Sequence, residues 1–159
     1  MHTELNRLEE QLAKTLEGEA WHGPSVLEIL EGVTAEHAAA HPIAGAHSIW
    51  ELVLHLCSDY HLVLRRLKGD GRQMTAAEGW PAVPAPTAEN WHESVSLLKQ
   101  LNNEFRQAIK SFPVERLDEP LVREVSYTAY TQFIGVTQHH LYHAGQMALI
   151  KKLLASNRE

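Results

Sequence analysis

Apolar residues recur at helical spacing in four long stretches of this chain, and this periodicity is the feature that most limits the possible folds. The stretches cover residues 3–17, 48–68, 87–112 and about 128–155. No segment shows the strict alternation of polar and apolar residues that is typical of a strand, and the chain has no internal repeat. The sequence therefore predicts an all-α protein, a four-helix bundle.

Local signals predict where the second of these helices begins and what precedes it. Ser48 and Glu51 have the spacing of a capping box, in which each side chain satisfies a free backbone N–H at the start of a helix. The preceding segment, residues 18–46, is rich in Gly and Pro and has short helical patterns near residues 25–30 and 34–39. It is predicted to be a connector with short helical turns, and not a linker between domains.

A second irregular segment, residues 69–90, combines Gly and Pro residues with Trp80. Loops of this length inside a compact domain are often lids or binding loops, so Trp80 is expected to line a pocket. Residues 114–126 have no clean period and are expected to be irregular. At 159 residues the chain is expected to form a single domain over residues 1–159.

Composition excludes several classes of protein. The formal net charge is −6 with Lys and Arg dispersed, so nucleic acid is not an expected partner. No apolar run approaches the roughly 20 residues that span a bilayer, so no membrane partner is expected. The start of the chain lacks the pattern of a secretory signal, and the single Cys57 excludes an intrachain disulfide. These observations favour a cytoplasmic protein.

Two histidines one helical turn apart stand out in the last helical stretch. At 100° per residue, Val136 and Ile150 lie on the same side of the helix as His139 and His143, so both histidines are expected on the buried stripe. His140 is turned about 100° away, and we expect it to be exposed or at a helix interface. A pair with this spacing can reach one metal ion, but a catalytic site for zinc needs a third protein ligand.

The best candidate for the third ligand is His55, midway along the second long helix. His22 and His47 are the alternates, and Glu51 or Asp59 could supply a carboxylate ligand or orient an imidazole. Metal ligands in helix bundles project inward from facing helices, which is the arrangement that His55 and the pair would require.

Simpler interpretations remain open for each of these residues. A helical His-x-x-x-His pair is often two unrelated side chains, and the H-E-x-x-H motif is absent. Glu51 is accounted for by the capping box, Asp59 by a solvated charge and Gln146 by a buried amide. Cys57 is expected to be a small buried side chain and not a nucleophile.

Two stretches of the sequence resemble the DinB-like superfamily of metal-binding four-helix bundles: PIAGAHSIWELVLHL at residues 42–56 and QHHLYHAGQMALIKK at residues 138–152. The resemblance implies that His55, His139 and His143 bind a divalent metal. It also implies a metal-dependent activity, because relatives are similar to S-transferases that use low-molecular-weight thiols such as bacillithiol, to a mycothiol-dependent isomerase, or to hydrolases.

The expected function is therefore that of a metal-dependent enzyme acting on a small molecule. Ni or Zn is the expected ion, with Mn or Fe as alternatives, and it would deprotonate either a thiol for transfer or a water for hydrolysis. Gln146 could hydrogen-bond a ligand or an imidazole, and Glu51 or His22 could move protons. The competing hypotheses are a bundle without any metal, and a non-catalytic bundle that a metal stabilises and that serves in binding or dimerisation. The sequence does not determine the oligomeric state, and a homodimer stays open as one assembly.

Overall fold

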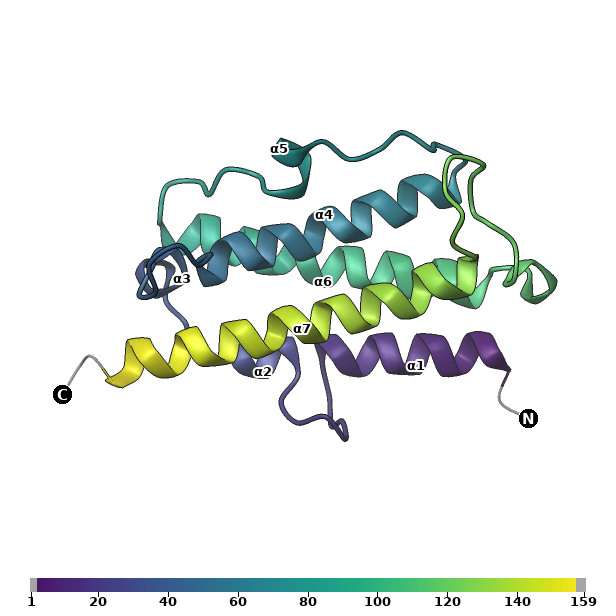
Figure 1. Ribbon diagram of the computed structural model, residues 1–159. Coiled ribbons are helices and arrows are strands. Elements are labelled where there is room, and N and C mark those ends of the chain that lie inside the picture. Colours follow the sequence, from purple (N-terminus) through teal and green to yellow (C-terminus); the bar gives the residue numbers. More distant parts are fainter. Residues whose placement is uncertain (1–2, 157–159) are drawn as a thin grey trace.

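The computed structural model describes residues 3–156, and four long helices dominate it (Figure 1). Within these residues there is no strand, only one isolated antiparallel bridge between Pro120 and Thr128. The all-α prediction is confirmed, and each long helix begins within two residues of its predicted start. The four helices are α1 (Glu4–Leu16), α4 (Ile49–Leu67), α6 (Ala88–Lys110) and α7 (Ala129–Ser156).

Short helical segments occupy the predicted connectors. The connector between α1 and α4 contains α2 (Val26–Leu30) and α3 (Ala35–Ala39), as its two local patterns predicted. The long loop between α4 and α6 contains one further turn, α5 (Ala76–Gly79). A 3₁₀ turn (Val114–Arg116) lies in the segment that was predicted to be irregular.

The four long helices form a closed ring of neighbours. Helix α4 packs against α6 and α7, and α1 packs against the same two helices. Helix α1 is short and covers only part of the length of α7. Helix α2 lies beyond the end of α1 and packs against the next part of α7 (Figure 1). The loop that carries α5 runs along the outer side of α4 (Figure 1). In the described part of the chain, no helix combines the length and the apolar character needed to cross a membrane.

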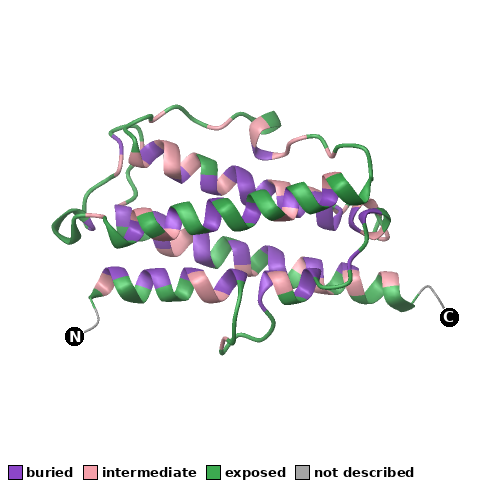
Figure 2. Cartoon of the chain, turned by 180° about the vertical axis from the view of Figure 1, so that it is seen from behind, coloured by how far each residue is buried: buried purple, intermediate pink, exposed green. Residues whose placement is uncertain are grey.

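The core lies between the helices and is formed by their apolar stripes. Buried residues face inward along each long helix, whereas the loops are mostly exposed (Figure 2). Burying one such leucine or phenylalanine side chain contributes about 1.5–3 kcal/mol to folding. The largest fully buried side chains include Trp50, Tyr60, Phe105 and Phe133.

Capping interactions fix both ends of α4. The hydroxyl of Ser48 accepts a hydrogen bond from the backbone N–H of Glu51 at 3.2 Å, and the Glu51 carboxylate accepts one from the N–H of Ser48 at 2.6 Å. At the other end, Gly69 has a φ of +88°, a conformation that favours glycine. The N–H of Asp70 then bonds to the carbonyl of Arg65 at 3.2 Å, which closes the helix. The capping box predicted from sequence is confirmed.

A buried polar pair joins α4 to α6. The side-chain amide of Asn102 donates a hydrogen bond to the hydroxyl of Tyr60 at 2.6 Å, and both residues are buried. Removing one partner of a buried hydrogen bond leaves the other unsatisfied, which costs about 1–3 kcal/mol.

We therefore expect Tyr60→Phe to lower the free energy of unfolding by about 1–3 kcal/mol, because it removes the hydroxyl but keeps the ring. Chemical denaturation followed by circular dichroism would measure this change. Tyr130→Phe is the matched control, since Tyr130 is 39% exposed and its loss of a hydroxyl should have little effect. Equal unfolding free energies for Tyr60→Phe and the wild type would contradict the assignment.

Candidate metal centre

Three histidines from two helices meet where α4 lies beside α7. His55 lies midway along α4, and His139 and His143 lie one turn apart on α7. The Nε2 atom of His139 is 3.0 Å from Nε2 of His55 and 3.1 Å from Nε2 of His143. All three ligand atoms lie within 4.8 Å of one another. The structure thus brings together the histidine trio (His55, His139 and His143) that the sequence singled out.

Hydrogen bonds at the opposite ring nitrogens direct two lone pairs toward the centre of the trio. The Nδ1 atom of His55 is 2.7 Å from the carbonyl oxygen of Gly79, and Nδ1 of His143 is 2.6 Å from Oε1 of Gln146. Because these oxygens only accept, each Nδ1 carries the proton and each Nε2 presents a lone pair. Gln146 contacts an imidazole, which is one of its two expected roles.

This set of donor atoms fits a divalent cation. The Nε2 lone pairs of His55 and His143 both face Nε2 of His139. A single N–H at that atom can donate well to only one of them, so hydrogen bonding within the trio leaves the other lone pair unsatisfied. A shared cation satisfies all three. Nitrogen ligands of a tetrahedral zinc ion are about 3.3 Å apart, given Zn–N bonds of 2.0–2.1 Å, and the observed separations of 3.0 and 3.1 Å are close to this value.

The predicted buried stripe of α7 is confirmed at Val136, His143 and Ile150, which are buried, but not at His139. His139 was expected on the buried stripe, but its side chain is 43% exposed and lies at the edge of the trio. His140, expected to be exposed or at a helix interface, is 1% exposed and packs edge-on against the ring of Tyr60 on α4, so it lies at a helix interface. His55 is also buried, at 8%, although its helical face is polar in sequence.

A buried carboxylate lies beside the trio. The Oδ2 atom of Asp59 is 3.3 Å from Nε2 of His139, 3.7 Å from Nε2 of His140 and 3.9 Å from Nε2 of His55. Its side chain is only 15% exposed and Oδ2 has no hydrogen-bond partner. Burial raises the pKa of Asp59 to about 7. The interpretation of Asp59 as a solvated surface charge was therefore wrong.

The histidines of the site are held neutral. Burial lowers the pKa of His139 to about 4, with a further contribution from the neighbouring imidazoles of His143 and His55. Burial also lowers the pKa of His55 and of His143, although the hydrogen bonds at Nδ1 partly oppose the shift. Neutral imidazole is the form that binds metal, so the trio is ready to bind an ion at neutral pH.

The loop between α4 and α6 covers the trio. The indole of Trp80 stacks in parallel on His55, with ring centroids 4.0 Å apart, and on His47, at 3.6 Å. Two rings centred over one indole at these distances cannot share a face, so Trp80 lies between them. Trp80, which was expected to line a pocket, packs directly on a ring of the trio, and His47 is a packing partner outside the ligand cluster.

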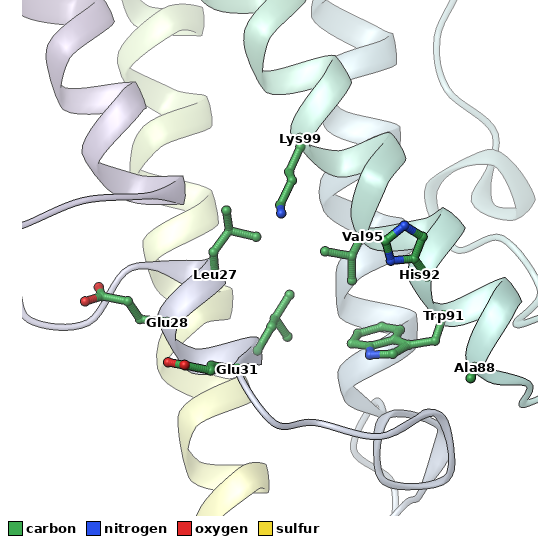
Figure 3. Close-up of a pocket in the computed structure, with 9 residues that line it drawn as sticks. Leu27, Glu28, Glu31, Ala88, Trp91, His92, Val95 and Lys99 are labelled. Atoms are coloured by element: carbon green, nitrogen blue, oxygen red, sulfur yellow. The ribbon is translucent and has the colours of Figure 1, made fainter.

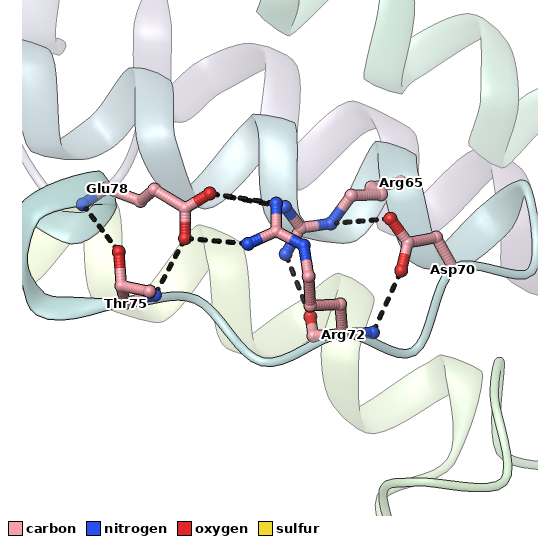
Figure 4. Close-up of polar contacts among 5 residues, drawn as sticks. All are labelled: Arg65, Asp70, Arg72, Thr75 and Glu78. Atoms are coloured by element: carbon pink, nitrogen blue, oxygen red, sulfur yellow. Dashed lines mark hydrogen bonds and ion pairs between the residues drawn. The ribbon is translucent and has the colours of Figure 1, made fainter.

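Polar contacts hold this loop against α4 (Figure 4). The guanidinium of Arg72 donates two hydrogen bonds to the carboxylate of Glu78, at 2.8 and 3.1 Å, and these hold the pKa of Glu78 at about 2. Thr75 and Glu78 form a capping box at the start of α5, and Arg65 donates to the carbonyl of Arg72 at 2.8 Å. These contacts between the loop and α4 position the carbonyl of Gly79, which accepts the hydrogen bond from His55 Nδ1.

The remaining sequence candidates lie away from the trio. Glu51 caps α4 and also contacts His41, with 2.8 Å between carboxylate oxygen and Nε2. His22 is exposed in the connector before α2, and the structure does not bring it to the site. Cys57 is 3% exposed, and burial raises the pKa of its thiol to about 12, which agrees with a packing role.

Hollows elsewhere on the molecule differ from this site. A groove of about 580 Å³ lies between α2 and α6, with Leu27, Trp91 and Val95 along it and Glu28 and Lys99 nearby (Figure 3). Its lining does not include the histidine trio or Asp59. By contrast, a pocket of about 270 Å³ between α4 and α7 is lined by both Asp59 and His139, so it reaches one member of the trio.

The metal-binding prediction is specific to three positions. Tag-free wild-type protein reconstituted with Zn²⁺ or Ni²⁺ is expected to retain close to one equivalent of metal, and His55→Ala and His143→Ala are each expected to lose it. Elemental analysis by mass spectrometry measures the content. His61→Ala and His92→Ala are matched controls, because they remove exposed histidines from α4 and α6. A wild type that retains no metal after reconstitution would contradict the prediction.

Acid is expected to destabilise the metal-free protein. The pKa values of His55, His139, His140 and His143 are lowered from 6.5, so the unfolded chain binds more protons as the pH falls through that value. Asp59, whose pKa is raised to about 7, has the opposite effect on stability, but this single carboxyl is outweighed by the four imidazoles. Stability should therefore fall as the pH is lowered from 6.5.

Denaturant midpoints measured from pH 7 down to about pH 5 would test this. Carboxylates with lowered pKa values, such as Glu9 and Glu51, lose their contribution only below their ordinary value of 4.5, so this interval reports on the histidines. His61→Gln, which replaces an exposed histidine, should give the same profile as the wild type. A midpoint that does not change over the interval would exclude buried neutral histidines.

Comparison with known proteins agrees with this geometry. A sequence profile described as the DinB superfamily matches residues 20–147, a range that contains His55, His139 and His143. No match was found among curated protein sequences or among solved structures. The profile covers most of the chain, including the first quoted stretch and residues 138–147 of the second, and it confirms the resemblance to this superfamily. The chain belongs to the DinB superfamily.

Proposed function

We propose that the protein is a metal-dependent enzyme that transfers a low-molecular-weight thiol to an electrophilic small molecule, using Zn²⁺ or Ni²⁺ held by His55, His139 and His143. The observation that carries the proposal is the convergence of three Nε2 atoms at a point that is open on one side. His139 is 43% exposed and lines the adjoining pocket, whereas a purely structural zinc site is closed by four protein ligands.

A divalent ion in this site would act as a Lewis acid that favours the thiolate form of a thiol close to it. The protein groups around it have separable roles. Gly79 and Gln146 hold the Nδ1 protons of His55 and His143, and so keep both rings in the tautomer that presents Nε2. Trp80 packs on His55 and covers that side of the site.

Asp59 is the candidate proton acceptor. Its Oδ2 atom has no hydrogen-bond partner, lies 3.3 Å from His139 Nε2, and belongs to a residue that lines the pocket. A pKa of about 7 is well matched to proton transfer near neutral pH, and a nearby cation would favour the ionised form that accepts the proton.

The proposed thiol transfer conserves atoms and electrons. The thiol proton passes to Asp59 Oδ2, the sulfur forms a bond to the electrophilic carbon, and the leaving group departs with the electron pair of the broken bond. The proton then leaves Asp59 with the departing group or with water. No oxidant or reductant is needed.

Turnover is expected to require both the metal and a thiol. Reconstituted wild-type protein mixed with bacillithiol or cysteine and 1-chloro-2,4-dinitrobenzene should form the thioether faster than the uncatalysed reaction. We expect His139→Ala to lose this rate enhancement, and Asp59→Asn to lower kcat by roughly 100-fold or more while retaining the metal, as expected for loss of a proton acceptor. Product absorbance follows the reaction.

The controls separate this proposal from its competitors. His61→Ala should retain full activity, because His61 is exposed on α4. Metal-dependent cleavage of ester substrates without any thiol would replace transfer by hydrolysis as the function. A protein that unfolds at lower temperature after chelation, and has no activity to lose, would be a bundle that metal only stabilises.

A further inference from the structure

The pocket beside the trio continues along the seam between α4 and α7 to a second polar group. Asp59 and His139 lie at one end, and Arg66 and Gln132 line the same pocket farther along. Asp59 and Arg66 are seven residues apart on α4, as are Gln132 and His139 on α7, so the two ends are separated by about 10 Å at 1.5 Å per residue. Apolar side chains line the pocket between them, including Leu62, Val63 and Val136.

The guanidinium of Arg66 lacks an anionic partner. Arg66 is only 7% exposed, and within residues 3–156 no carboxylate forms an ion pair with it. Its Nη1 donates to Oε1 of Gln132 at 2.9 Å, but its Nε has no hydrogen-bond partner. Burial lowers the pKa of Arg66, yet a guanidinium stays protonated, so an uncompensated positive charge lies at this end of the pocket.

Gln132 adds a second unsatisfied donor. It is 7% exposed, and its Nε2 amide has no partner although its Oε1 is bonded to Arg66. Two unsatisfied buried donors on residues that line one pocket, one of them on a cationic side chain, cost free energy unless an acceptor reaches them. Buried charges in proteins are normally paired, so the chemistry missing here is that of an anion.

We propose that Arg66 and Gln132 form a binding site for the carboxylate of the small molecule whose thiol reaches the histidine trio. A carboxylate fits because it has two acceptor oxygens and one charge, which match one guanidinium and one amide donor. This inference rests on the proposed function for the thiol end only. The ligand class is a thiol that carries a carboxylate about 10 Å away along a largely apolar chain.

The span can be tested with mercaptocarboxylic acids of different length. Isothermal titration of zinc-loaded wild-type protein is expected to show the tightest binding for 8-mercaptooctanoic acid, with weaker binding for 3-mercaptopropanoic and 11-mercaptoundecanoic acids. 8-Mercapto-1-octanol, which lacks the charge, should bind roughly tenfold or more weakly than the acid of equal length. The phosphonate analogue should bind no better than the carboxylate, and tighter phosphonate binding would overturn the choice of anion.

Substitutions at Arg66 and Gln132 test whether these residues cause the preference for the acid over the alcohol. Arg66→Met and Gln132→Leu are expected to abolish or reduce the preference for the acid over the alcohol, while retaining the bound metal. Arg66→Lys keeps the charge but loses the planar fork, so it should retain only part of the preference. Arg7→Met, which removes an exposed guanidinium from α1, is the matched control and should behave as the wild type.

The outcomes distinguish this inference from the proposed function. Equal binding of acid and alcohol by the wild type would overturn the carboxylate site and leave thiol binding intact. If neither thiol binds, the metal-free protein still tests the anion site, because octanoate but not octanol should raise the melting temperature of the wild type and not of Arg66→Met. An Arg66→Met protein that folds, binds metal and still prefers the acid over the alcohol as strongly as the wild type does would overturn the binding role of Arg66.

Discussion

The hydrogen bond from His55 Nδ1 to the carbonyl oxygen of Gly79 joins the long loop to the interior of the bundle. It fixes the proton of His55 away from the trio, and the bond between His143 and Gln146 has the same effect on the second ring. The Nε2 lone pairs of His55 and His143 point at one place, and the protein supplies too few hydrogen-bond donors there to pair with both. An added cation can, and this gives the trio its chemical specificity.

The packing of α4 against α7 determines both ends of the pocket. The two helices run antiparallel with Asp59 opposite His139, and this register also places Arg66 opposite Gln132 two turns away. A shift of one helical turn would break both pairings together. The apolar contacts of α1 and α6 with these helices maintain that register, so the bundle core acts as the support of the site.

Sequence periodicity and capping motifs were sufficient to predict the helices, but not every buried position of α7. That helix packs against α1, α2 and α4, so apolar residues occur on several of its sides and do not define one buried stripe. His139 was therefore assigned to the wrong environment, whereas His140 lies at the interface with α4, as one of its two expectations had it. The three histidines still meet, because His139 reaches its partners from the edge. The Gly79 carbonyl and the stack of Trp80 depend on loop conformation, which spacing along a chain does not reveal.

Unsatisfied polar atoms show where this bundle departs from optimal stability. Each buried donor or acceptor without a partner costs about 1–3 kcal/mol, and native proteins have few of them. Among the described residues, every buried side-chain atom of this kind lies on α4 or α7, whereas α1 and α6 have none. These atoms are Asp59 Oδ2, Arg66 Nε, Gln132 Nε2, Thr137 Oγ1 and His140 Nε2. Arg65 Nε also lacks a hydrogen bond, but it forms an ion pair with Asp70 Oδ2 at 3.4 Å. Such a cost, confined to the two helices that carry the trio, is expected where a protein is built to bind a ligand along one seam and to remain apolar elsewhere.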